Sequence, residues 1–424
     1  MLKNKQIKKW AEELFPLNRS LAGKYNRLTL KYIQKNINKN FKIKSVKSGT
    51  KVFGWTIPKE YSVTKATLKN ERNKIICDVK KNNLHIVVNS KPVNKWLSYN
   101  QIKRKIFFSN KMPNSIPYVT SYYKKDWGFC MSKNDFLKLN KKEKYHAFIK
   151  SKFISGSMNF GELLIKGRSK KEILICSYIC HPSLANNELS GILSIAMLSK
   201  IIKKSKYSIR LLLIPETIGA IYYINKKIKF LKKNLIAGFN LTCVGINGPY
   251  TLISSITENT YADKIVKRVG SKYANFQKLS FMKRGSNERQ FGCQNLNFPF
   301  VTICRKRFGD YKEYHTSADN LKILNYQTIL DTVNFIRKII DEINKNKIYK
   351  KNNFCEPFLS KNNLISSLAT IENMRKLDRK SISNFLAYVD KSNDLVSLKE
   401  QLKIKNINKI VKILEKNKLI TKVI

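Results

Sequence analysis

Residues 173–191, with the sequence ILICSYICHPSLANNELSG, constrain the fold of this chain more than any other stretch. The first part, 173–179, is a short apolar run that ends just before His181 and a proline. So short a run beside a helix breaker predicts a buried strand. A longer, periodic apolar segment follows at 191–202 and predicts a helix. His181 and Glu188 therefore lie between a strand end and a helix start, which is the edge of an open α/β sheet where ligands bind.

The second half of the chain alternates between short apolar runs and longer periodic segments. The predicted strands are 161–166, 173–179, 209–214, 235–243 and 300–305. The predicted helices are 191–204, 219–230, 257–269 and 321–344. This alternation predicts the α/β fold class, with a largely parallel or mixed sheet that helices cover on both faces.

At 424 residues the chain is too long for a single core, and its pattern changes along its length. Runs rich in β-forming residues, such as 52–57 and 116–123, predict a subdomain inserted into the main domain. After an Asn/Lys-rich linker, a helix, a turn, a helix and a terminal β pair give the outline of a winged helix. The predicted parts are the N-terminal part of the main domain at 1–45, the β-rich inserted subdomain at 46–135, the main domain at 136–350 and the winged helix at 356–424.

The formal net charge of +55 suggests nucleic-acid binding, but the distribution of the charge argues against it. Only 14 of the 83 basic residues are arginines, and the lysines are spread along the whole chain among many asparagines. Proteins that bind nucleic acid tend to cluster their cations and to rely on the arginine fork. The composition therefore indicates an AT-rich genome rather than a nucleic-acid partner.

The sequence predicts neither export nor a membrane span. The basic, amphipathic N-terminus lacks the apolar core of a signal sequence. The longest apolar stretch, 191–202, is well short of the roughly 20 residues that cross a membrane. The eight cysteines include no C-x-x-C pair, and Cys176, Cys180, Cys243 and Cys304 lie in apolar runs, as buried free thiols do. We therefore expect a cytoplasmic protein without a membrane partner.

Two of the four histidines lie where chemistry is expected. His85 lies inside a β run and His146 follows a charged run, so a structural or surface role is expected for both. His181 and His315 instead stand among polar groups at the ends of segments. Glu216 follows an apolar strand and a proline, where poor solvation should raise its pKa and suit it to act as a general base. Taken alone, Glu216 fits a helix cap equally well.

His181, Glu188 and His315 together form the ligand set of a catalytic zinc site that keeps a fourth position open for water. One Zn²⁺ ion there would lower the pKa of the bound water toward about 7 and polarise a carbonyl group. Glu216 would take the proton of that water and pass it to the leaving amine. The predicted chemistry is metal-assisted hydrolysis of an amide bond, in a small peptide or another amide-containing substrate.

Several long motifs, in order from about residue 15 to the end, resemble a bacterial family of aminopeptidase-like proteins with the zinc exopeptidase fold. They are RSLAG at 19–23, VFGWTIP at 52–58, LHIVVNSKPV at 84–93, PYVTSYY at 117–123, CHPSLANNELSG at 180–191, PETIG at 215–219, RGSNERQ at 284–290 and YHTS at 314–317. The resemblance implies an α/β/α sandwich with a mixed sheet, an inserted domain and a C-terminal winged helix. It also implies a zinc hydrolase connected with polysaccharide or cell-surface biosynthesis.

The resemblance further implies one metal ion rather than two. Two-metal aminopeptidases carry a histidine, an aspartate, a glutamate and an aspartate at the positions where this chain has, in that order, Tyr178, Asn187, Thr217 and Thr242. Where relatives often have a further aspartate, this chain has Asn287. The one-metal ligand set is what remains after this comparison.

Arg284, Glu288 and Arg289 form a polar cluster ahead of His315 in the sequence. Arginine binds carboxylates well, so the cluster predicts a substrate-binding role. A structural network of ion pairs fits the same three residues equally well.

Two other functions stay open beside the hydrolase. A catalytically weak scaffold or binding protein would keep the aminopeptidase fold without the activity. A DNA-binding regulator would use the second helix of the winged helix, where Lys409, Lys412 and Lys416 could face a major groove. Lysines at this density occur throughout the chain, so nucleic acid is not the expected partner. The sequence leaves open whether the chain forms a homo-oligomer.

Overall fold

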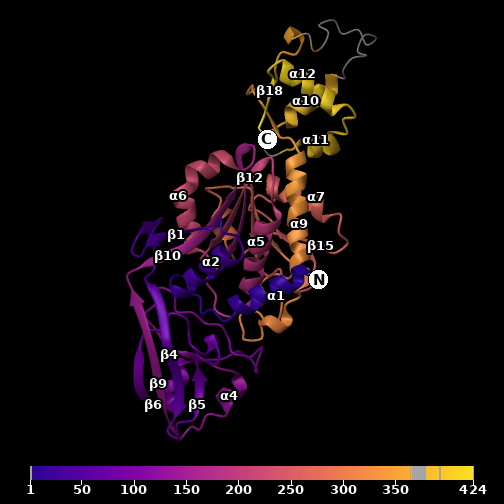
Figure 1. Cartoon of the computed structure of the whole chain (residues 1–424). Helices are drawn as coiled ribbons and strands as arrows, with labels where there is room; N and C mark the ends of the chain where they lie inside the picture. The colour runs from indigo at the N-terminus through magenta and orange to yellow at the C-terminus, as the bar shows by residue number, and fades with distance from the viewer. Residues whose placement is uncertain (1, 363, 365–378, 391–392, 424) are drawn as a thin grey trace.

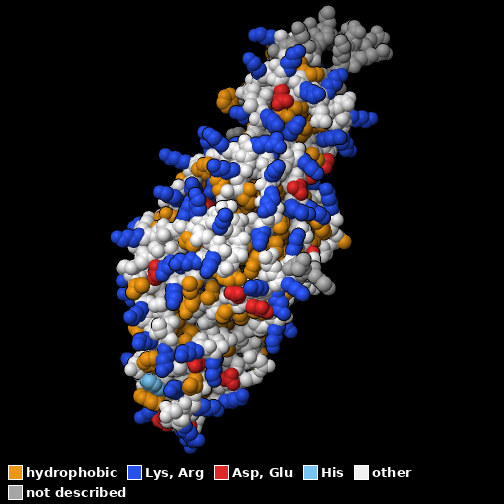
Figure 2. Space-filling view, viewed as in Figure 1, with side chains coloured by type: hydrophobic (Ala, Val, Ile, Leu, Met, Phe, Trp, Pro, Cys, Tyr) orange, Lys and Arg blue, Asp and Glu red, His pale blue; other side chains and the backbone are white. Residues whose placement is uncertain are grey.

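The computed structural model describes residues 2–362, 364, 379–390 and 393–423, which form an elongated molecule in three parts (Figure 1). A large sheet between helices lies in the centre, a β-rich part at one end and a helical C-terminal part at the other. None of the described helices combines the length and apolar character needed to cross a membrane. Figure 2 shows Lys and Arg side chains scattered over the visible face rather than gathered into one patch.

The central sheet has eight strands among the described residues, in the order β1-β10-β12-β11-β13-β16-β14-β15. Strands β12, β11, β13 and β16 run parallel, and β10 and β14 flank them antiparallel. The bounds are β1 Lys42–Lys47, β10 Ser157–Ile165, β11 Ser169–Tyr178, β12 Tyr207–Ile214, β13 Leu235–Leu241, β14 Tyr250–Ile253, β15 Phe276–Leu279 and β16 Phe300–Cys304. The five predicted strands and the mixed sheet are confirmed, and β1, β14 and β15 are additional.

Helices cover both faces of this sheet, as predicted. Ile173 and Ile175 of β11 pack into the core on one face, and Leu174 and Cys176 pack into the core on the other. This alternation follows from the two-residue period of a strand. The first face is covered by α1 Leu2–Leu14, α2 Lys24–Asn36, α5 Ser190–Ile201, α7 Tyr261–Gly270 and α9 Tyr326–Lys345. The second face is covered by α6 Ile218–Asn234 and α8 Glu288–Phe291. The molecule is therefore an α/β/α sandwich.

The β-rich part is inserted between β1 and β10, which pair directly with each other in the central sheet. Its four-stranded antiparallel sheet has the order β5-β4-β9-β6, with β4 Glu60–Asn70, β5 Ile75–Asp78, β6 Val93–Ser98 and β9 Lys144–Ile154. Because β9 pairs with both β4 and β6, the subdomain extends beyond its predicted end at residue 135. A hairpin of β2 Lys51–Val52 and β3 Trp55–Thr56 precedes the four strands.

The C-terminal part has its own apolar core, formed by α10 Arg379–Tyr388, α11 Leu395–Leu402 and α12 Ile407–Lys416. Its strands β17 Tyr349–Lys351 and β18 Ile420–Lys422 form an antiparallel pair, and β17 lies within the predicted Asn/Lys-rich linker at 344–353. Residues 365–378 of the predicted winged helix lie outside the described residues. The winged helix itself stays a prediction.

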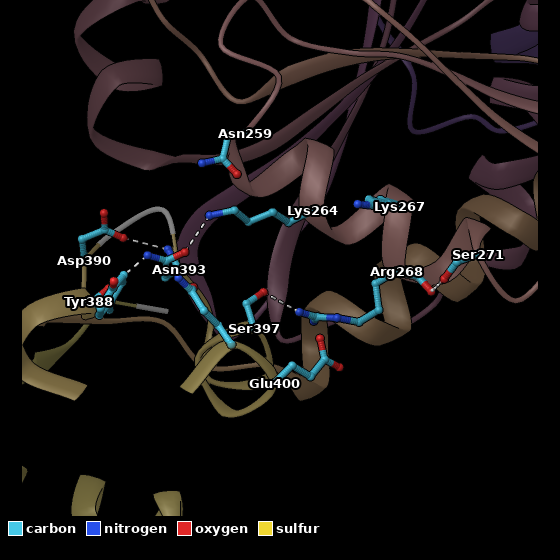
Figure 3. A pocket seen from close by; sticks show the side chains of 11 residues that line it. Asn259, Lys264, Lys267, Arg268, Ser271, Tyr388, Asp390, Asn393, Ser397 and Glu400 are labelled. Atoms are coloured by element: carbon cyan, nitrogen blue, oxygen red, sulfur yellow. Dashed lines mark hydrogen bonds between the residues drawn. The ribbon is translucent and has the colours of Figure 1, made fainter. Parts of the chain in front are cut away.

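A cleft of about 700 Å³ separates α7 from the C-terminal part (Figure 3). Arg268 of α7 reaches across it and donates to the buried carboxylate of Asp394 at 2.8 Å and to Ser397 at 2.8 Å. Asp394 also accepts from the Ser397 amide and so caps α11. These bonds make the cleft a structural joint between two parts of the chain.

Candidate active site

The predicted site residues meet at the carboxyl edge of the parallel strands. His181 follows β11, Glu216 follows β12 and Thr242 follows β13, so parallel neighbours deliver them to the same edge. His315 reaches this edge from the loop after β16, and its ring centroid lies 5.7 Å from that of His181. The structure therefore brings His181, Glu216 and His315 together at one edge, and their role as a site stays a prediction.

A single π-helical turn, Ala185–Leu189, places Glu188 beneath the edge, directly before α5. Such turns occur often at functional sites. Asp319 holds the turn by accepting from the amides of Ala185, Asn186 and Asn187. Burial raises the pKa of Asp319 to about 6, against the effect of these donors.

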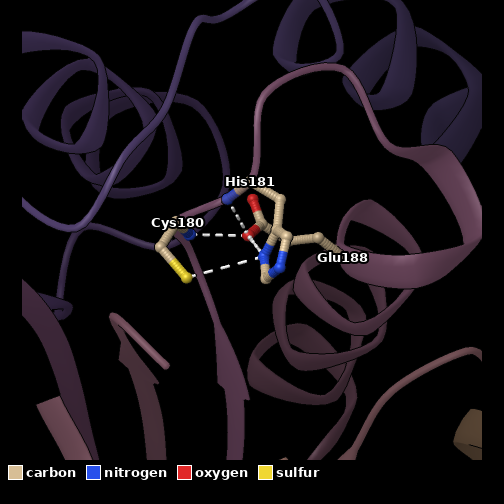
Figure 4. Close-up of side chains that lie close together, drawn as sticks. All are labelled: Cys180, His181 and Glu188. Atoms are coloured by element: carbon tan, nitrogen blue, oxygen red, sulfur yellow. Dashed lines mark hydrogen bonds and ion pairs between the residues drawn. The ribbon is translucent and has the colours of Figure 1, made fainter. Parts of the chain in front are cut away.

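Glu188 is fully buried and is surrounded by hydrogen-bond donors (Figure 4). Its Oε1 accepts from Arg19 Nε at 2.5 Å, and Arg19 is buried to the same degree. Its Oε2 accepts from the amides of Cys180 and His181 and lies 3.0 Å from His181 Nδ1. A carboxylate offers about four acceptor positions, and four donors face this one.

These donors do not fit a zinc ion. Among the described residues, the three potential ligands within reach of one ion are Cys180, His181 and Glu188, without His315. An ion there would lie beside the Arg19 guanidinium and would have to displace backbone amides from Glu188. Burial raises the pKa of the Cys180 thiol. The ligand set His181, Glu188 and His315 stays a prediction that this geometry does not support.

The Cys180–His181–Glu188 group is not a nucleophilic triad either. The Cys180 sulfur and the Glu188 carboxylate both approach the same ring nitrogen, Nδ1 of His181. A triad needs the base to contact the nucleophile through one nitrogen and the acid through the other.

Tyr178, Asn187 and Thr242, three of the four positions where the resemblance implies ligands in two-metal aminopeptidases, form a neutral, buried cluster. The Tyr178 hydroxyl lies 2.6 Å from the Asn187 carbonyl oxygen and 2.6 Å from the Thr242 hydroxyl. It also accepts from Asn187 Nδ2 at 2.8 Å, and Thr242 donates to the Asn187 carbonyl. The Tyr178 hydroxyl is thus fully partnered inside the protein, without a cation.

Glu216 is half-buried at the edge, where it accepts from the Ser286 hydroxyl at 2.6 Å. Burial raises its pKa, and nearby His181, Ser286 and Arg289 offset part of this rise. Its bond to Ser286 ties the carboxylate to a loop, whereas a capping residue would bond to the start of α6. A carboxylate with a raised pKa at this place is compatible with a general base, which stays a prediction.

The three predicted substrate-binding residues do not share one site. Glu288 is fully buried and accepts from the amides of Gly285 and Ser286 and from the Thr302 hydroxyl. Arg284 is exposed and lies over the ring of Phe281, 4.8 Å from its centroid. Only Arg289 reaches the edge, where it donates to the Thr217 hydroxyl at 2.8 Å. Substrate binding by these residues stays a prediction.

His315 has a left-handed backbone, with φ of 55°. Its Nε2 is buried and has no hydrogen-bond partner among the described atoms. Burial and the neighbouring His181 lower its pKa to about 3, so the ring is neutral near pH 7. Tyr118 packs against both histidines, with centroid distances of 5.1 and 5.0 Å, and its amide donates to the His315 carbonyl. Tyr118 belongs to the inserted part, which therefore covers the site.

The fold and the sheet edge define an aminopeptidase-like protein. Residues 8–346 match the family model described as a domain of unknown function, DUF4910, and the chain belongs to this family. A protein of Clostridium acetobutylicum, named for polysaccharide biosynthesis and an aminopeptidase-like domain, is 38% identical over 360 residues. The match covers 82% of this chain and 80% of that protein.

Solved structures give the same class. The crystal structure of a putative peptidase from Clostridium acetobutylicum matches with a TM-score of 0.78 and 33% identity, over 99% of this chain and 96% of that one. BSAP, a zinc aminopeptidase from Bacillus subtilis, matches with a TM-score of 0.61 and 14% identity, over 80% of this chain and 94% of that one. At 14% identity the second match shows the fold alone.

Proposed function

We propose that this chain is a binding protein with the aminopeptidase fold, and that it holds a ligand at the sheet edge without a zinc ion. The observation that carries the proposal is the set of donors around Glu188, which accepts from Arg19 and from the amides of Cys180 and His181. A zinc ion bound by Glu188 would have to displace these donors from the carboxylate. The neutral cluster of Tyr178, Asn187 and Thr242 offers no imidazole, thiolate or carboxylate for a second ion.

The proposed ligand is a carbohydrate, in a role in polysaccharide biosynthesis. The name of the Clostridium acetobutylicum relative supports this assignment. So do the buried polar atoms without a partner among the described residues, which include Asn187 Oδ1 and His315 Nε2. Sugar hydroxyls both donate and accept, so they can partner a mixture of donors and acceptors of this kind.

A zinc-dependent hydrolase is the second candidate. It would use His181, Glu188 and His315 as ligands of one ion and Glu216 as the base that hydrolyses an amide bond. The observation in its favour is the unpartnered Nε2 of His315 beside His181. For this function Glu188 would have to exchange Arg19 for the ion.

Elemental analysis of protein purified without chelator, before and after addition of zinc, separates the two candidates. We expect no stoichiometric zinc and no release of amine from aminoacyl-p-nitroanilides. The combined variant Tyr178→His/Asn187→Asp/Thr217→Glu/Thr242→Asp should gain zinc if these positions are what the protein lacks. Stoichiometric zinc in the parent that is lost in His181→Ala and in His315→Ala would overturn the proposal in favour of the hydrolase.

A further inference from the structure

Three aromatic side chains are exposed next to the candidate site, and no part of the site uses them. Phe53 is 59% exposed, Trp55 40% and Tyr123 54%. The rings of Trp55 and Tyr123 lie edge to face, 5.7 Å apart, and the Tyr123 hydroxyl donates to the Thr56 carbonyl at 3.2 Å. We call Phe53, Trp55 and Tyr123 the aromatic platform. It joins the β2–β3 hairpin to the segment that carries Tyr118.

The backbone conformation of the platform is costly. Phe53 has φ of 43° and is followed by Gly54 with φ of 80°, and Tyr123 has φ of 61°. Left-handed backbone costs a residue other than glycine roughly 1 kcal/mol or more, and it is rare for bulky side chains. Asparagine or glycine is the usual residue at such a hairpin turn. Phe53 and Tyr123 thus keep a costly backbone conformation and still expose their rings, which indicates a role in binding rather than in packing.

The platform borders the sheet edge. Val52, at the base of the hairpin, packs in one apolar cluster with Tyr178, Cys180 and Ile218. Tyr122, next to Tyr123 in the chain, places its hydroxyl 3.3 Å from the Cys180 carbonyl and 3.1 Å from the Tyr118 hydroxyl. Val52 and Tyr122 therefore connect the platform to the sheet edge.

Positive charge surrounds the platform. Four exposed lysines lie in its two segments, namely Lys51, Lys59, Lys124 and Lys125. The two carboxylates of residues 51–60 and 116–126 are both paired, Glu60 with Arg27 and Asp126 with Lys105. The surroundings of the rings therefore favour an anionic ligand.

We infer that the platform binds pyranose rings of an acidic glycan. The apolar C–H face of each ring would stack on the aromatic rings, and its carboxylate or phosphate groups would face the lysines. Three side chains are too few for a stable protein partner, which needs about 800 Å² on each side, but they suit the repeating unit of a polymer. The inference rests on the proposed function and names the ligand class and the surface that holds it.

Isothermal titration calorimetry of the full chain tests the inference. The probes are an oligogalacturonate, a phosphodiester-linked glycan, a neutral maltooligosaccharide and a single-stranded oligonucleotide of matched charge. We expect one or both anionic glycans to bind at least tenfold more tightly than the neutral one, and the stronger of the two identifies the anionic group. Trp55→Ala and Phe53→Asn should each weaken that binding at least tenfold. Asparagine suits the left-handed backbone, so Phe53→Asn removes a ring without disturbing the turn.

Trp96→Ala is the matched control, because Trp96 is 52% exposed and stacks on His146 at a distance from the site in the inserted sheet. Unchanged glycan affinity in correctly folded Trp55→Ala and Phe53→Asn would overturn the inference. An equal loss in Trp96→Ala, no glycan binding by the parent, or tighter binding of the oligonucleotide would also overturn it. Zinc analysis tests the proposed function independently of glycan binding, because the platform contains no residue of the sheet edge.

Discussion

The sheet edge and the aromatic platform are neighbours, but they treat their side chains in opposite ways. At the edge, Tyr178 and Glu188 are buried, and each finds its partners inside the protein. On the platform, Phe53 and Tyr123 adopt left-handed backbone and still expose their rings. The contrast indicates that Tyr178 and Glu188 stabilise the fold at the edge, whereas the backbone of the platform lowers the stability of the protein in order to expose aromatic rings.

The largest effect is expected for Arg19→Met. The substitution leaves Glu188 buried and charged without its cation, and loss of one partner of a buried ion pair costs about 3 to 5 kcal/mol. Chemical denaturation measures this change in the free energy of unfolding. Arg19→Met/Glu188→Gln should recover part of the loss, because glutamine is neutral and its side-chain carbonyl still accepts from the amides of Cys180 and His181.

A loss below about 1 kcal/mol in Arg19→Met would contradict a structural role for the pair. It would mean that Glu188 readily gives up Arg19, as the zinc hydrolase requires. The same experiment therefore sharpens the choice between the two proposed functions.

Tyr178→Phe should destabilise the protein by about 1 to 3 kcal/mol, because it leaves buried groups of Asn187 and Thr242 short of a partner. Tyr207→Phe is the control, since the Tyr207 hydroxyl is buried and has no partner among the described residues. The control should be neutral or stabilising in the same denaturation assay. Equal costs in the two variants would show that the hydrogen bonds of the Tyr178 hydroxyl add nothing beyond burial of a hydroxyl group.

The sequence predicted the parts of this region that depend on local pattern. The run 173–179 and the breaker after it identified β11 and the edge, and the longer periodic segment identified α5. Strands β14 and β15 were missed because each has only four residues, and β1, KIKSVK, is mostly polar.

The partners of the site residues could not be predicted. Arg19 and Glu188 are 169 residues apart, and no spacing rule connects them. Glu288 belongs to a polar cluster in the sequence. The sequence alone does not distinguish a carboxylate that accepts hydrogen bonds from loop amides from a carboxylate that binds a substrate. Tyr118 reaches the histidines from the inserted part, so its role depends on how two domains pack.

The Arg27–Glu60 ion pair is less buried than the residues of the edge and less exposed than those of the platform. The Arg27 side chain is 34% exposed and the Glu60 side chain 8%. Burial alone would raise the pKa of Glu60, but hydrogen bonds from Arg27 and the Ser157 amide outweigh it and lower the pKa. Because the pKa of Glu60 is lowered in the folded state, the pair stabilises the fold at pH values above the ordinary pKa of glutamate. This stabilisation is lost as the pH falls through the pKa that Glu60 has in the folded protein.

Thermal unfolding between about pH 7 and about pH 3 should therefore show a decline in Tm at acid pH that is smaller in Glu60→Gln. At neutral pH the substitution should cost on the order of 1 to 2 kcal/mol, since solvent screens the exposed side of the pair. Parallel pH profiles for the parent and the variant would show that Glu60 does not contribute to acid sensitivity.

The smallest effect concerns the turn of the platform and tests the strain directly. Phe53→Asn and Phe53→Ala both remove the ring, so their difference isolates the backbone. Asparagine tolerates the left-handed region better than alanine, and Phe53→Asn should be more stable by about 0.5 to 1 kcal/mol.

Leu137, which is 67% exposed in the short helix Lys133–Leu137, is the matched position, and there alanine should be the more stable replacement. If alanine equals asparagine at position 53, the turn does not hold a left-handed residue there. The platform would then lose its evidence of strain and keep only its exposed rings and its lysines.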